Sequence, residues 1–342
     1  MSHDKLKHIG HSVYQAVRDG GAGIIDLSSR GRIEVSGSEA VMFLNGLITN
    51  DMKTLEPFHW MPAVFPNVQG RLIAAVRVVR LGDADSKPRF LLDTEAATHS
   101  ALLKTIERFT MAGDFKVNDV TKETSCLSVQ GKQALPLAGC IGDLDLEERN
   151  RAIEIRWNDT AATIIRATHT AEDGADVIVD RQYAAALSEQ LIQAGAVTVD
   201  RETFETLRIE AGVPQFGKDM DETNVVSETN LDDAISFTKG CYVGQEIIAR
   251  IKYRGHVAKK LTGLTFDEQG LAPSGAVIRS SDGKEIGRVM SAAFSPKLER
   301  AIALGYVRYE YLAAETQVAV GDKGLKAKVT KPPFVRGSWY DD

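Results

Sequence analysis

The sequence changes character near residue 255. Beyond this point, short β segments such as KKLTGLTF, AIALGYVR and KAKVTK are separated by the turn sequences SSDGKE, SPKLE and GDKG, without a strong helical pattern. Short strands with turn residues between them are typical of a small antiparallel barrel or sandwich. We therefore expect a domain boundary between residues 254 and 255, with a C-terminal β-barrel domain over 255–342.

Helical and strand patterns are mixed before this boundary. Apolar residues recur at helical spacing in SEAVMFLNGLITND, THSALLKTIERFTMAG, YAAALSEQLIQAG and RETFETLRIEAGV. Ser38 and Thr98 are candidate caps of the first two helices, and the segment from His11 to Arg18 also has helical character. Strand patterns lie between these helices in irregular order, so the expected class for residues 1–254 is α+β.

Length, charge and cysteine content limit the classes of function. The chain has 342 residues, a net charge of −6 and three cysteines, Cys126, Cys140 and Cys241. An odd number of widely spaced cysteines fits neither a disulfide framework nor a paired zinc site, which indicates reduced thiols and no metal site. No long apolar stretch or secretory pattern occurs, so we expect a cytoplasmic protein without membrane contact. The negative charge argues against direct nucleic-acid binding.

The segment KGCYVGQE at 239–246 has the properties of a reactive thiol site. The thiolate is the reactive form of cysteine, and a cation such as Lys239, two residues before Cys241, can lower the pKa of the thiol. Flanking glycines permit a sharp turn that leaves the sulfur accessible, and Gln245 and Glu246 could orient a bound group. The alternative is a small buried residue in a tight turn, since free cysteine is among the most buried residue types.

A basic run follows this segment. If 248–254 is a strand, Arg250, Lys252 and Arg254 share one face at a period of two. Such a strip could anchor a polyanionic tail. It could equally be a solvated edge strand that discourages aggregation.

The polar loop PQFGKDMDETNVVSETN precedes the KGCYVGQE segment and contains Glu228. A carboxylate can accept two parallel N–H bonds from an amidine-like edge, as a pterin ring presents. The alternative for Glu228 is solvated surface. The DMDETN stretch at 219–224 lacks the glycine of a calcium loop, and we expect it to be a solvated, capping loop.

Residues 207–257, with KGCYVGQE as the signature, closely resemble the YgfZ family of folate-binding proteins. These are relatives of the glycine cleavage system T protein that act in iron–sulfur cluster assembly or maintenance. The stretch IDLSSRGRIEVSGSEAVMFLNGLITND also looks like the opening of that family, and the C-terminal stretch fits its terminal barrel. The resemblance implies two intertwined α+β lobes over 1–254 around a central folate cleft, closed by the C-terminal antiparallel β-barrel.

The resemblance also implies roles for individual residues. Cys241 would be the functional thiol with Lys239 beside it, and Glu228 would stand at the pterin-holding position. Tetrahydrofolate or a one-carbon derivative would be the cofactor, and iron–sulfur client proteins or the assembly machinery would be the partners. Further folate-binding residues would be Tyr242, Gln245 and Arg250.

Two departures from the family patterns bear on the chemistry. Val226 stands where the family has proline two residues before Glu228, so the rigid entry to the loop is lost. T proteins supply a carboxylate for one-carbon transfer from a segment of the form GG-apolar-apolar-DD, and both acids are alanine here, Ala74 and Ala75. Alanine can neither accept a proton nor stabilise a developing cation.

The sequence therefore favours a folate-dependent accessory factor for iron–sulfur proteins over aminomethyl transfer of the T-protein type. The thiol could ligate cluster iron transiently, form a mixed disulfide with a client or take part in one-carbon chemistry. The alternative is a tetrahydrofolate-dependent aminomethyltransferase or demethylase that takes its acid from elsewhere in the chain. A small-molecule sensor whose barrel docks on a partner is a third hypothesis.

Overall fold

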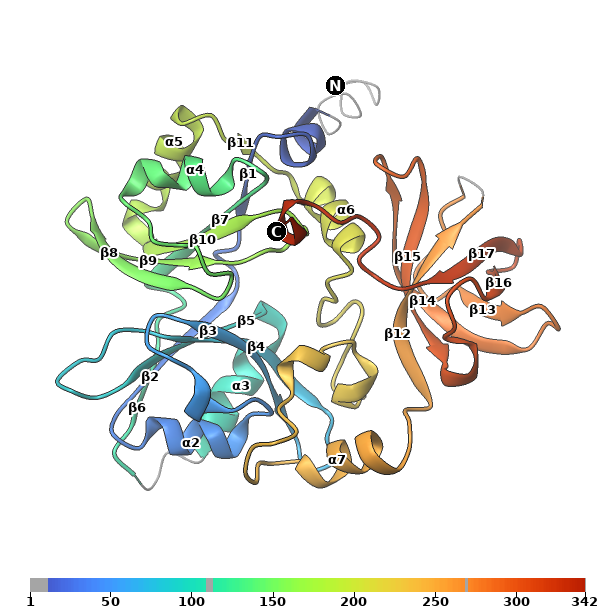
Figure 1. Ribbon diagram of the computed structural model, residues 1–342, viewed down its shortest axis with the longest axis horizontal. Helices are drawn as coiled ribbons and strands as arrows, with labels where there is room; N and C mark the ends of the chain where they lie inside the picture. The colour runs from blue at the N-terminus through green and yellow to red at the C-terminus, as the bar shows by residue number, and fades with distance from the viewer. Residues whose placement is uncertain (1–11, 109–112, 268–269, 342) are drawn as a thin grey trace.

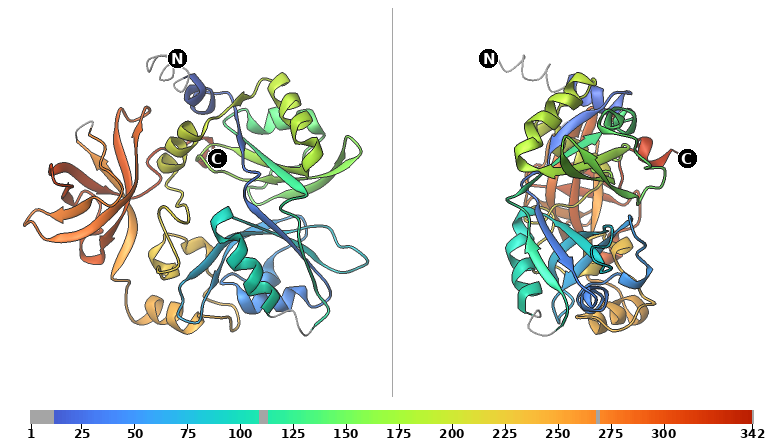
Figure 2. Two further views of the ribbon diagram at one scale, coloured as in Figure 1. Left: turned by 180° about the vertical axis from the view of Figure 1, so that it is seen from behind. Right: turned by 90° about the vertical axis from the view of Figure 1, so that its left-hand side faces the viewer.

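The structure is a computed structural model that describes residues 12–108, 113–267 and 270–341. Two lobes, each built on a β-sheet, and a C-terminal barrel surround the segment 213–244, which runs between them in Figures 1 and 2. The chain starts in one lobe, crosses to the other for five strands and returns to the first. The expected α+β class with two intertwined lobes and an antiparallel barrel is therefore confirmed.

The first lobe contains a six-stranded sheet in the order β11-β1-β7-β10-β9-β8. Its strands are antiparallel except for the pair β1 and β11. The strands are β1 (Gly23–Asp26), β7 (Thr124–Gln130), β8 (Ala152–Trp157), β9 (Thr160–Arg166), β10 (Gly174–Asp180) and β11 (Val197–Thr198). Apolar side chains of α4 (Ala134–Ala138) and α5 (Ala184–Gln193) pack against this sheet in one buried cluster.

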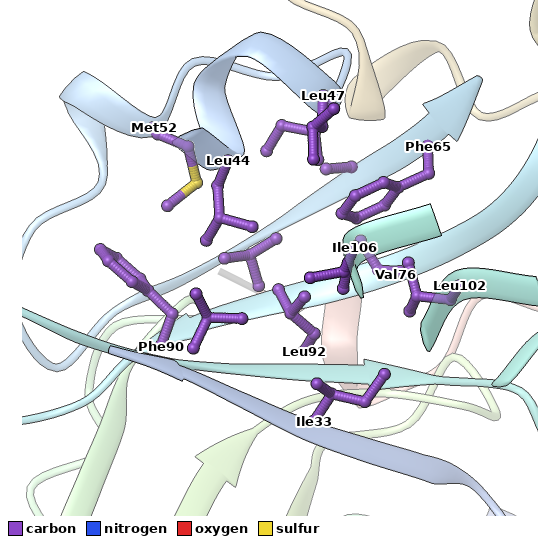
Figure 3. Close-up of a cluster of buried hydrophobic side chains, with 14 of the residues drawn as sticks. Ile33, Leu44, Leu47, Met52, Phe65, Val76, Phe90, Leu92, Leu102 and Ile106 are labelled. Atoms are coloured by element: carbon purple, nitrogen blue, oxygen red, sulfur yellow. The ribbon is translucent and has the colours of Figure 1, made fainter. Parts of the chain in front are cut away.

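The second lobe contains a five-stranded antiparallel sheet in the order β3-β4-β5-β2-β6. Its strands are β2 (Gly31–Ser36), β3 (Trp60–Pro66), β4 (Leu72–Arg80), β5 (Arg89–Thr94) and β6 (Lys116–Asp119). The helices α2 (Ala40–Leu47) and α3 (Ala96–Arg108) bury their apolar sides on it. Figure 3 shows Leu44 of α2 and Leu102 and Ile106 of α3 converging on Phe90 and Leu92 of β5. This packing fixes α2, α3 and the β3–β4 hairpin (residues 60–80) relative to one another.

Six antiparallel strands close the C-terminal barrel in the order β12-β15-β14-β13-β16-β17. They are β12 (Lys259–Phe266), β13 (Val277–Ser280), β14 (Glu285–Ser295), β15 (Arg300–Arg308), β16 (Gln317–Val320) and β17 (Leu325–Thr330). Closure leaves no free edge, which explains how such short strands form a stable unit. The barrel begins at Lys259, a few residues beyond the predicted boundary.

The helix α6 (Arg201–Ala211) joins the first lobe to the barrel. The Asp200 side chain caps it by accepting the Thr203 N–H at 2.9 Å, and Gly212 ends it in the left-handed conformation. Ile209 packs with Ile302 and Leu304 on the outside of the barrel. The helix therefore sets the position of segment 213–244 that follows it.

A buried ionic network joins the two lobes. The Arg77 guanidinium of β4 donates to Asp93 in its own lobe at 2.9 Å and to Asp176 of β10 in the other lobe at 2.6 Å. His169 also contacts the Asp176 carboxylate, at 3.0 Å. Because removal of one partner leaves a buried charge uncompensated, this network restricts movement between the lobes.

Two predicted helix caps are wrong. The hydroxyl of Ser38 donates to Asp114 at 2.7 Å, and the residue before α2 is Glu39, which makes no side-chain capping bond. Thr98 lies inside α3 and donates to the Glu95 carbonyl at 3.0 Å. Both hydroxyls found partners that the local sequence does not reveal. The expected helix near the N-terminus is present at residues 12–18, and His11 lies outside the described residues.

The strand over 248–254 on which the basic strip depended is absent, because these residues belong to α7 (Gln245–Arg254). Ile247, Ile248 and Ile251 recur at helical spacing, and Ile248 is fully buried. A helix turns about 100° per residue, so Arg250 and Arg254 share a face and Lys252 lies on another. The ammonium of Lys252 lies over the Phe237 ring, 5.0 Å from its centroid. The three cations therefore do not form one strip.

None of the helices in the described part of the chain combines the length and the hydropathy required of a membrane span.

Candidate functional site

Segment 213–244 contains most of the predicted site residues. It connects α6 to α7, lies between the two lobes and the barrel (Figure 1), and includes the short 3₁₀ helices η4 (Val226–Glu228) and η5 (Asp232–Ala234). We call residues 213–230 the acidic loop and residues 239–244 the thiol loop. Both contact the β3–β4 hairpin.

Lys239 attaches the thiol loop to the C-terminal end of α2. Its ammonium donates to the carbonyl oxygens of Asn45 at 2.7 Å, Ile48 at 2.9 Å and Asn50 at 2.6 Å. These three acceptors use all three ammonium N–H groups, and a cation at this end of a helix is favourable for the helix dipole. Burial lowers the pKa of Lys239 to about 8. The ammonium also lies over the Tyr242 ring, 5.0 Å from its centroid. The predicted effect of Lys239 on the thiol stays a prediction.

Backbone contacts hold the other end of the thiol loop. The Val243 N–H donates to the Gly46 carbonyl at 3.1 Å. Gly244 has φ +78, and a Cβ added there would lie 2.4 Å from the Asn67 carbonyl oxygen in the turn of the β3–β4 hairpin. Only glycine combines this backbone conformation with so close an approach. The loop is therefore clamped between α2 and the hairpin.

The clamped loop presents Cys241 at the surface. Cys241 is exposed, whereas the next residue, Tyr242, is only 8 % exposed, and burial raises its pKa to about 12. Gln245 is half-buried at the start of α7, and Arg250 is exposed one turn later. Of the remaining thiols, Cys126 is buried and Cys140 is exposed in the first lobe. The predicted residues of this group are thus near one another along the chain but differ in accessibility.

Glu228 lies in the acidic loop and is half-buried. The Asn224 amide donates to Glu228 Oε2 at 3.0 Å, which orients the carboxylate. Glu228 also closes the short η4 helix, because its N–H donates to the Val225 carbonyl at 2.9 Å. The carboxylate is therefore held on a structured turn.

Val226 ties the acidic loop to the β3–β4 hairpin. It is fully buried, and its N–H donates to the Gly70 carbonyl at 3.0 Å, a bond that a proline could not form. The Leu72 N–H donates to the Asn224 carbonyl at 3.0 Å beside it. The expected loss of a rigid entry to the loop is therefore wrong, since hydrogen bonds to the hairpin replace the proline.

The expectation of a solvated DMDETN loop is wrong for Asp219, which is fully buried. Its Oδ2 accepts from Arg208 Nη1 at 2.7 Å and from the Gln215 N–H at 2.9 Å. Its Oδ1 is buried and has no hydrogen-bond partner among the described residues. Asp221 fits the prediction better, since it is a local cap for the Thr223 N–H at 2.8 Å.

Tyr306 of β15 adds a group that sequence reasoning missed. Its hydroxyl is buried without a hydrogen-bond partner among the described residues. Burial, and next the negative charge of Glu228, raise the pKa of Tyr306, with smaller contributions from Asp219 and Asp221. The hydroxyl therefore lies within electrostatic range of the acidic loop. The sequence has no signal for this pairing, because the barrel strand and the loop are brought together only by the fold.

Glu95, directly after β5, is a second missed residue. Its carboxylate oxygens accept the Phe216 N–H at 3.0 and 3.2 Å, and burial raises its pKa. Glu95 is thus a carboxyl group beside the acidic loop whose protonated form is favoured more than in an ordinary glutamate.

Ala74 and Ala75 project from opposite faces of β4. Ala74 is fully buried in the core of the second lobe, whereas Ala75 is partly buried and packs in the cluster that includes Met220 and Val226 of the acidic loop. Only position 75 therefore faces the segment that carries Glu228.

Two cavities flank the segment. One, of about 290 Å³, reaches the thiol loop at Val243, and the other, of about 460 Å³, lies between Lys218 and the barrel residue Pro273. Neither is lined by Glu228. The described residues also contain no group of three or more histidine, cysteine or acidic side chains arranged to hold a metal ion.

Comparison with known proteins identifies the family. The GCVT N-terminal domain matches residues 7–239, and the glycine cleavage T-protein C-terminal barrel domain matches residues 259–336. The chain belongs to the glycine cleavage T-protein family. This confirms the broader part of the predicted resemblance, and membership of the YgfZ subgroup stays a prediction.

Named relatives in this family are aminomethyltransferases. The enzyme of Thermoanaerobacter pseudethanolicus is 27% identical over 337 residues, covering 96% of this chain and 90% of the relative. That of Rubrobacter xylanophilus is 30% identical over 326 residues, covering 94% and 85%. The crystal structure of the glycine cleavage system aminomethyltransferase T from Bartonella henselae has the same fold, with a TM-score of 0.87 at 23% identity and coverage of 96% and 90%.

Proposed function

We propose that this member of the T-protein family binds a tetrahydrofolate species at the acidic loop and is an accessory factor for iron–sulfur proteins. Cys241 is the group that meets the client. Ala75 is the observation that carries the proposal. It occupies the position on β4 that faces the acidic loop, where T proteins place an acid, and a methyl group cannot assist aminomethyl transfer.

The residues at the acidic loop fit a pterin. Glu228, oriented by Asn224, can accept two N–H groups from the pterin edge. The buried Tyr306 hydroxyl and Asp219 Oδ1 lack partners among the described residues, and such buried polar groups are costly unless a water or a ligand pairs with them. Tetrahydrofolate would supply one-carbon carrier chemistry when bound, and the chain would supply the orienting hydrogen bonds.

Cys241 suits contact with a second protein. It is exposed on a loop clamped at both ends, so its position is fixed while its sulfur is accessible. One thiol cannot hold a cluster, and the described residues offer no other cluster of ligands beside it. Any cluster that Cys241 touches would therefore keep ligands from the client.

A second candidate function is tetrahydrofolate-dependent aminomethyl transfer, which the names of the relatives favour. Glu95 is the specific residue that supports it. Its raised pKa and its position beside Phe216 of the acidic loop suit a general acid or base that would replace the missing acid at position 75.

Folate binding is tested by thermal unfolding with tetrahydrofolate. A ligand that binds only the folded protein raises the melting temperature, so a rise that grows with concentration is expected. Glu228→Ala should reduce this rise, and the control Glu222→Ala, a change at an exposed residue of the same loop, should leave it intact. A flat titration of the wild type would remove folate from the proposal, and an equal rise in Glu228→Ala would remove Glu228 from the site.

Two assays separate the candidate functions. Purified protein with tetrahydrofolate and an aminomethyl donor should form no methylenetetrahydrofolate; formation that Glu95→Gln abolishes would establish the second candidate instead. A cell that lacks the protein should regain iron–sulfur enzyme activity with the wild type and with Cys140→Ser, which changes the other exposed thiol, but not with Cys241→Ser. Full recovery with Cys241→Ser, at equal protein level, would exclude the thiol from the function.

A further inference from the structure

An apolar cavity of about 290 Å³ lies beside the thiol loop. Its wall combines Leu47 of α2, Pro66 and Ile73 of the β3–β4 hairpin and Val243 of the thiol loop. These elements are fixed by the lobe core and by the clamp on the thiol loop, so the cavity is preformed. Pockets for small-molecule ligands are usually about 300–1,000 Å³. This cavity lies just below that range, which suits one large apolar side chain of a protein partner better than a whole cofactor.

The rim of the cavity also has the properties of an interaction surface. Val68, in the turn of the hairpin, lines the cavity and is 77 % exposed. Exposed apolar side chains at a concave apolar site are typical of places where a partner buries an anchoring residue.

Positive charge lies on one side of the rim. Lys104 of α3 lines the cavity, is exposed and makes no ion pair with any residue in the described ranges. Arg108, one helical turn later, lines the same cavity. Their charge is opposite to the net charge of −6 of the whole chain. A patch of this kind selects acidic groups next to the apolar anchor.

We infer that this cavity is a docking site for a segment of a partner protein that presents one large apolar side chain next to acidic residues. Val243 in the cavity wall is two residues from the exposed Cys241, so a docked segment would hold its neighbouring residues close to the thiol. Because two residues of fully extended chain span about 7 Å, the backbone of Cys241 lies within about that distance of Val243. The inference rests on the proposed function in one respect, that the partner is the protein which meets Cys241.

The test measures how fast Cys241 reacts with peptides. The protein carries Cys140→Ser, so that Cys241 is the exposed thiol among the described residues. The probe is a twelve-residue peptide with one phenylalanine, three acidic residues and a cysteine activated as its mixed disulfide with thionitrobenzoate. The Cys241 thiolate attacks the peptide sulfur, the new disulfide forms, and the released thionitrobenzoate anion gives the rate by its absorbance.

Docking raises the effective concentration of the peptide at the thiol. We expect a rate that saturates with peptide concentration and that, at low concentration, is about tenfold faster than for a peptide with serine in place of phenylalanine. Thr105→Phe, which fills the cavity from α3, Lys104→Glu and Val68→Ser should each lower the rate to that of the control peptide. Lys132→Glu, the same charge change at an exposed residue of the first lobe, should have no effect.

Equal rates for both peptides, or wild-type rates in Thr105→Phe and Lys104→Glu, would overturn the inference. So would a concentration-dependent dimer in sedimentation that Thr105→Phe abolishes, since a second copy would then occupy the cavity. The melting-temperature rise with tetrahydrofolate should be the same in all these variants. Absence of that rise in the wild type, or full recovery of cells by Cys241→Ser, would contradict the proposed function. Neither outcome would change the interpretation of the peptide rates.

Discussion

The acidic loop and the thiol loop lie against the same hairpin but are held by different forces. The acidic loop combines backbone bonds to the hairpin with a buried ion pair between Asp219 and Arg208. In the thiol loop the one buried cation, Lys239, is satisfied by main-chain carbonyls, and Gly244 packs on the hairpin backbone. The first arrangement buries Asp219 and leaves Glu228 half-buried, and the second uses backbone shape to leave one sulfur exposed. A clamped backbone can therefore present a reactive side chain that a buried ionic network would conceal.

Breaking the ion pair of the acidic loop should have the largest effect. Arg208→Ala leaves Asp219 with an uncompensated buried charge, which typically costs about 3–5 kcal/mol of the free energy of unfolding. Urea denaturation measures the change. The matched control Asp221→Ala removes a carboxylate from a local turn of the same loop and should cost well under half as much. Equal losses of stability in Arg208→Ala and Asp221→Ala would mean that the burial of Asp219 does not make its ion pair more important than the turn at Asp221.

A methyl group at the second glycine of the thiol loop should have the next largest effect. Gly244→Ala forces a left-handed backbone on alanine, at a cost of about 1–2 kcal/mol, and overpacking against Asn67 adds about 1–3 kcal/mol. Gly240→Ala is the control, because no atom lies within 4 Å of the added Cβ and φ is not positive, so its effect should stay within about 0.5 kcal/mol. An unchanged free energy of unfolding in Gly244→Ala, in the same denaturation assay, would show that the contact of Gly244 with the hairpin does not hold the thiol loop.

The pH dependence of stability sharpens the comparison at Lys239. Burial lowers its folded-state pKa from 10.5 to about 8, so between these values the unfolded chain binds more protons at this residue than the folded protein does. The contribution of Lys239 to the free energy of unfolding therefore rises with pH over this window, by at most about 1.4 kcal/mol per pH unit. The difference in stability between the wild type and Lys239→Met should shift in favour of the wild type from pH 8 to pH 10.5 and stay constant at lower pH. A stability difference that does not change with pH would show that the pKa of Lys239 is the same in the folded and unfolded states.

The smallest expected effect is the difference in alkylation rate between the two exposed thiols, Cys140 and Cys241. Burial raises the pKa of Cys126 well above its ordinary value and removes it from solvent, so iodoacetamide should label it only after unfolding. Partial burial also raises the pKa of Cys140. Because the thiolate is the reactive form, Cys241 should react severalfold faster than Cys140. Peptide mass spectrometry over time measures the rates, and faster labelling of Cys140 would contradict this order.

Periodicity predicted most of the secondary structure, and the errors have local causes. The helices α2, α3, α5 and α6 and most strands of the barrel were predicted because each spans several turns or alternations of apolar residues. The short helix α4 and the four-residue strand β16 were not predicted, because each is too short to show such a pattern. The strand expected over 248–254 is a helix because the apolar spacing of Ile247, Ile248 and Ile251 decided it, and the alternating cations did not. The caps expected at Ser38 and Thr98 were wrong because hydroxyl groups hydrogen-bond to several kinds of nearby partner, and the fold supplied others.

The candidate site was predicted only where one residue or one motif carries the signal. Cys241 stands out in the sequence as a thiol between glycines, whereas Glu228 was singled out through the family resemblance, and the roles of both stay predictions. Arg208 with Asp219, Tyr306 beside the acidic loop and Glu95 at Phe216 could not be predicted, because each depends on a partner from another element. The sequence around each of these residues does not indicate which distant residue it will contact.

The sequence by itself determined the available chemistry: a thiol at position 241, and alanine in place of carboxylates at 74 and 75. These are covalent facts that no fold can change. The tertiary structure alone decided that Ala75 and not Ala74 faces the acidic loop, that Lys239 bonds to α2, and that Asp219 is buried. Burial and pairing depend on which surfaces the packing of distant segments brings together, and that information is spread over the whole chain.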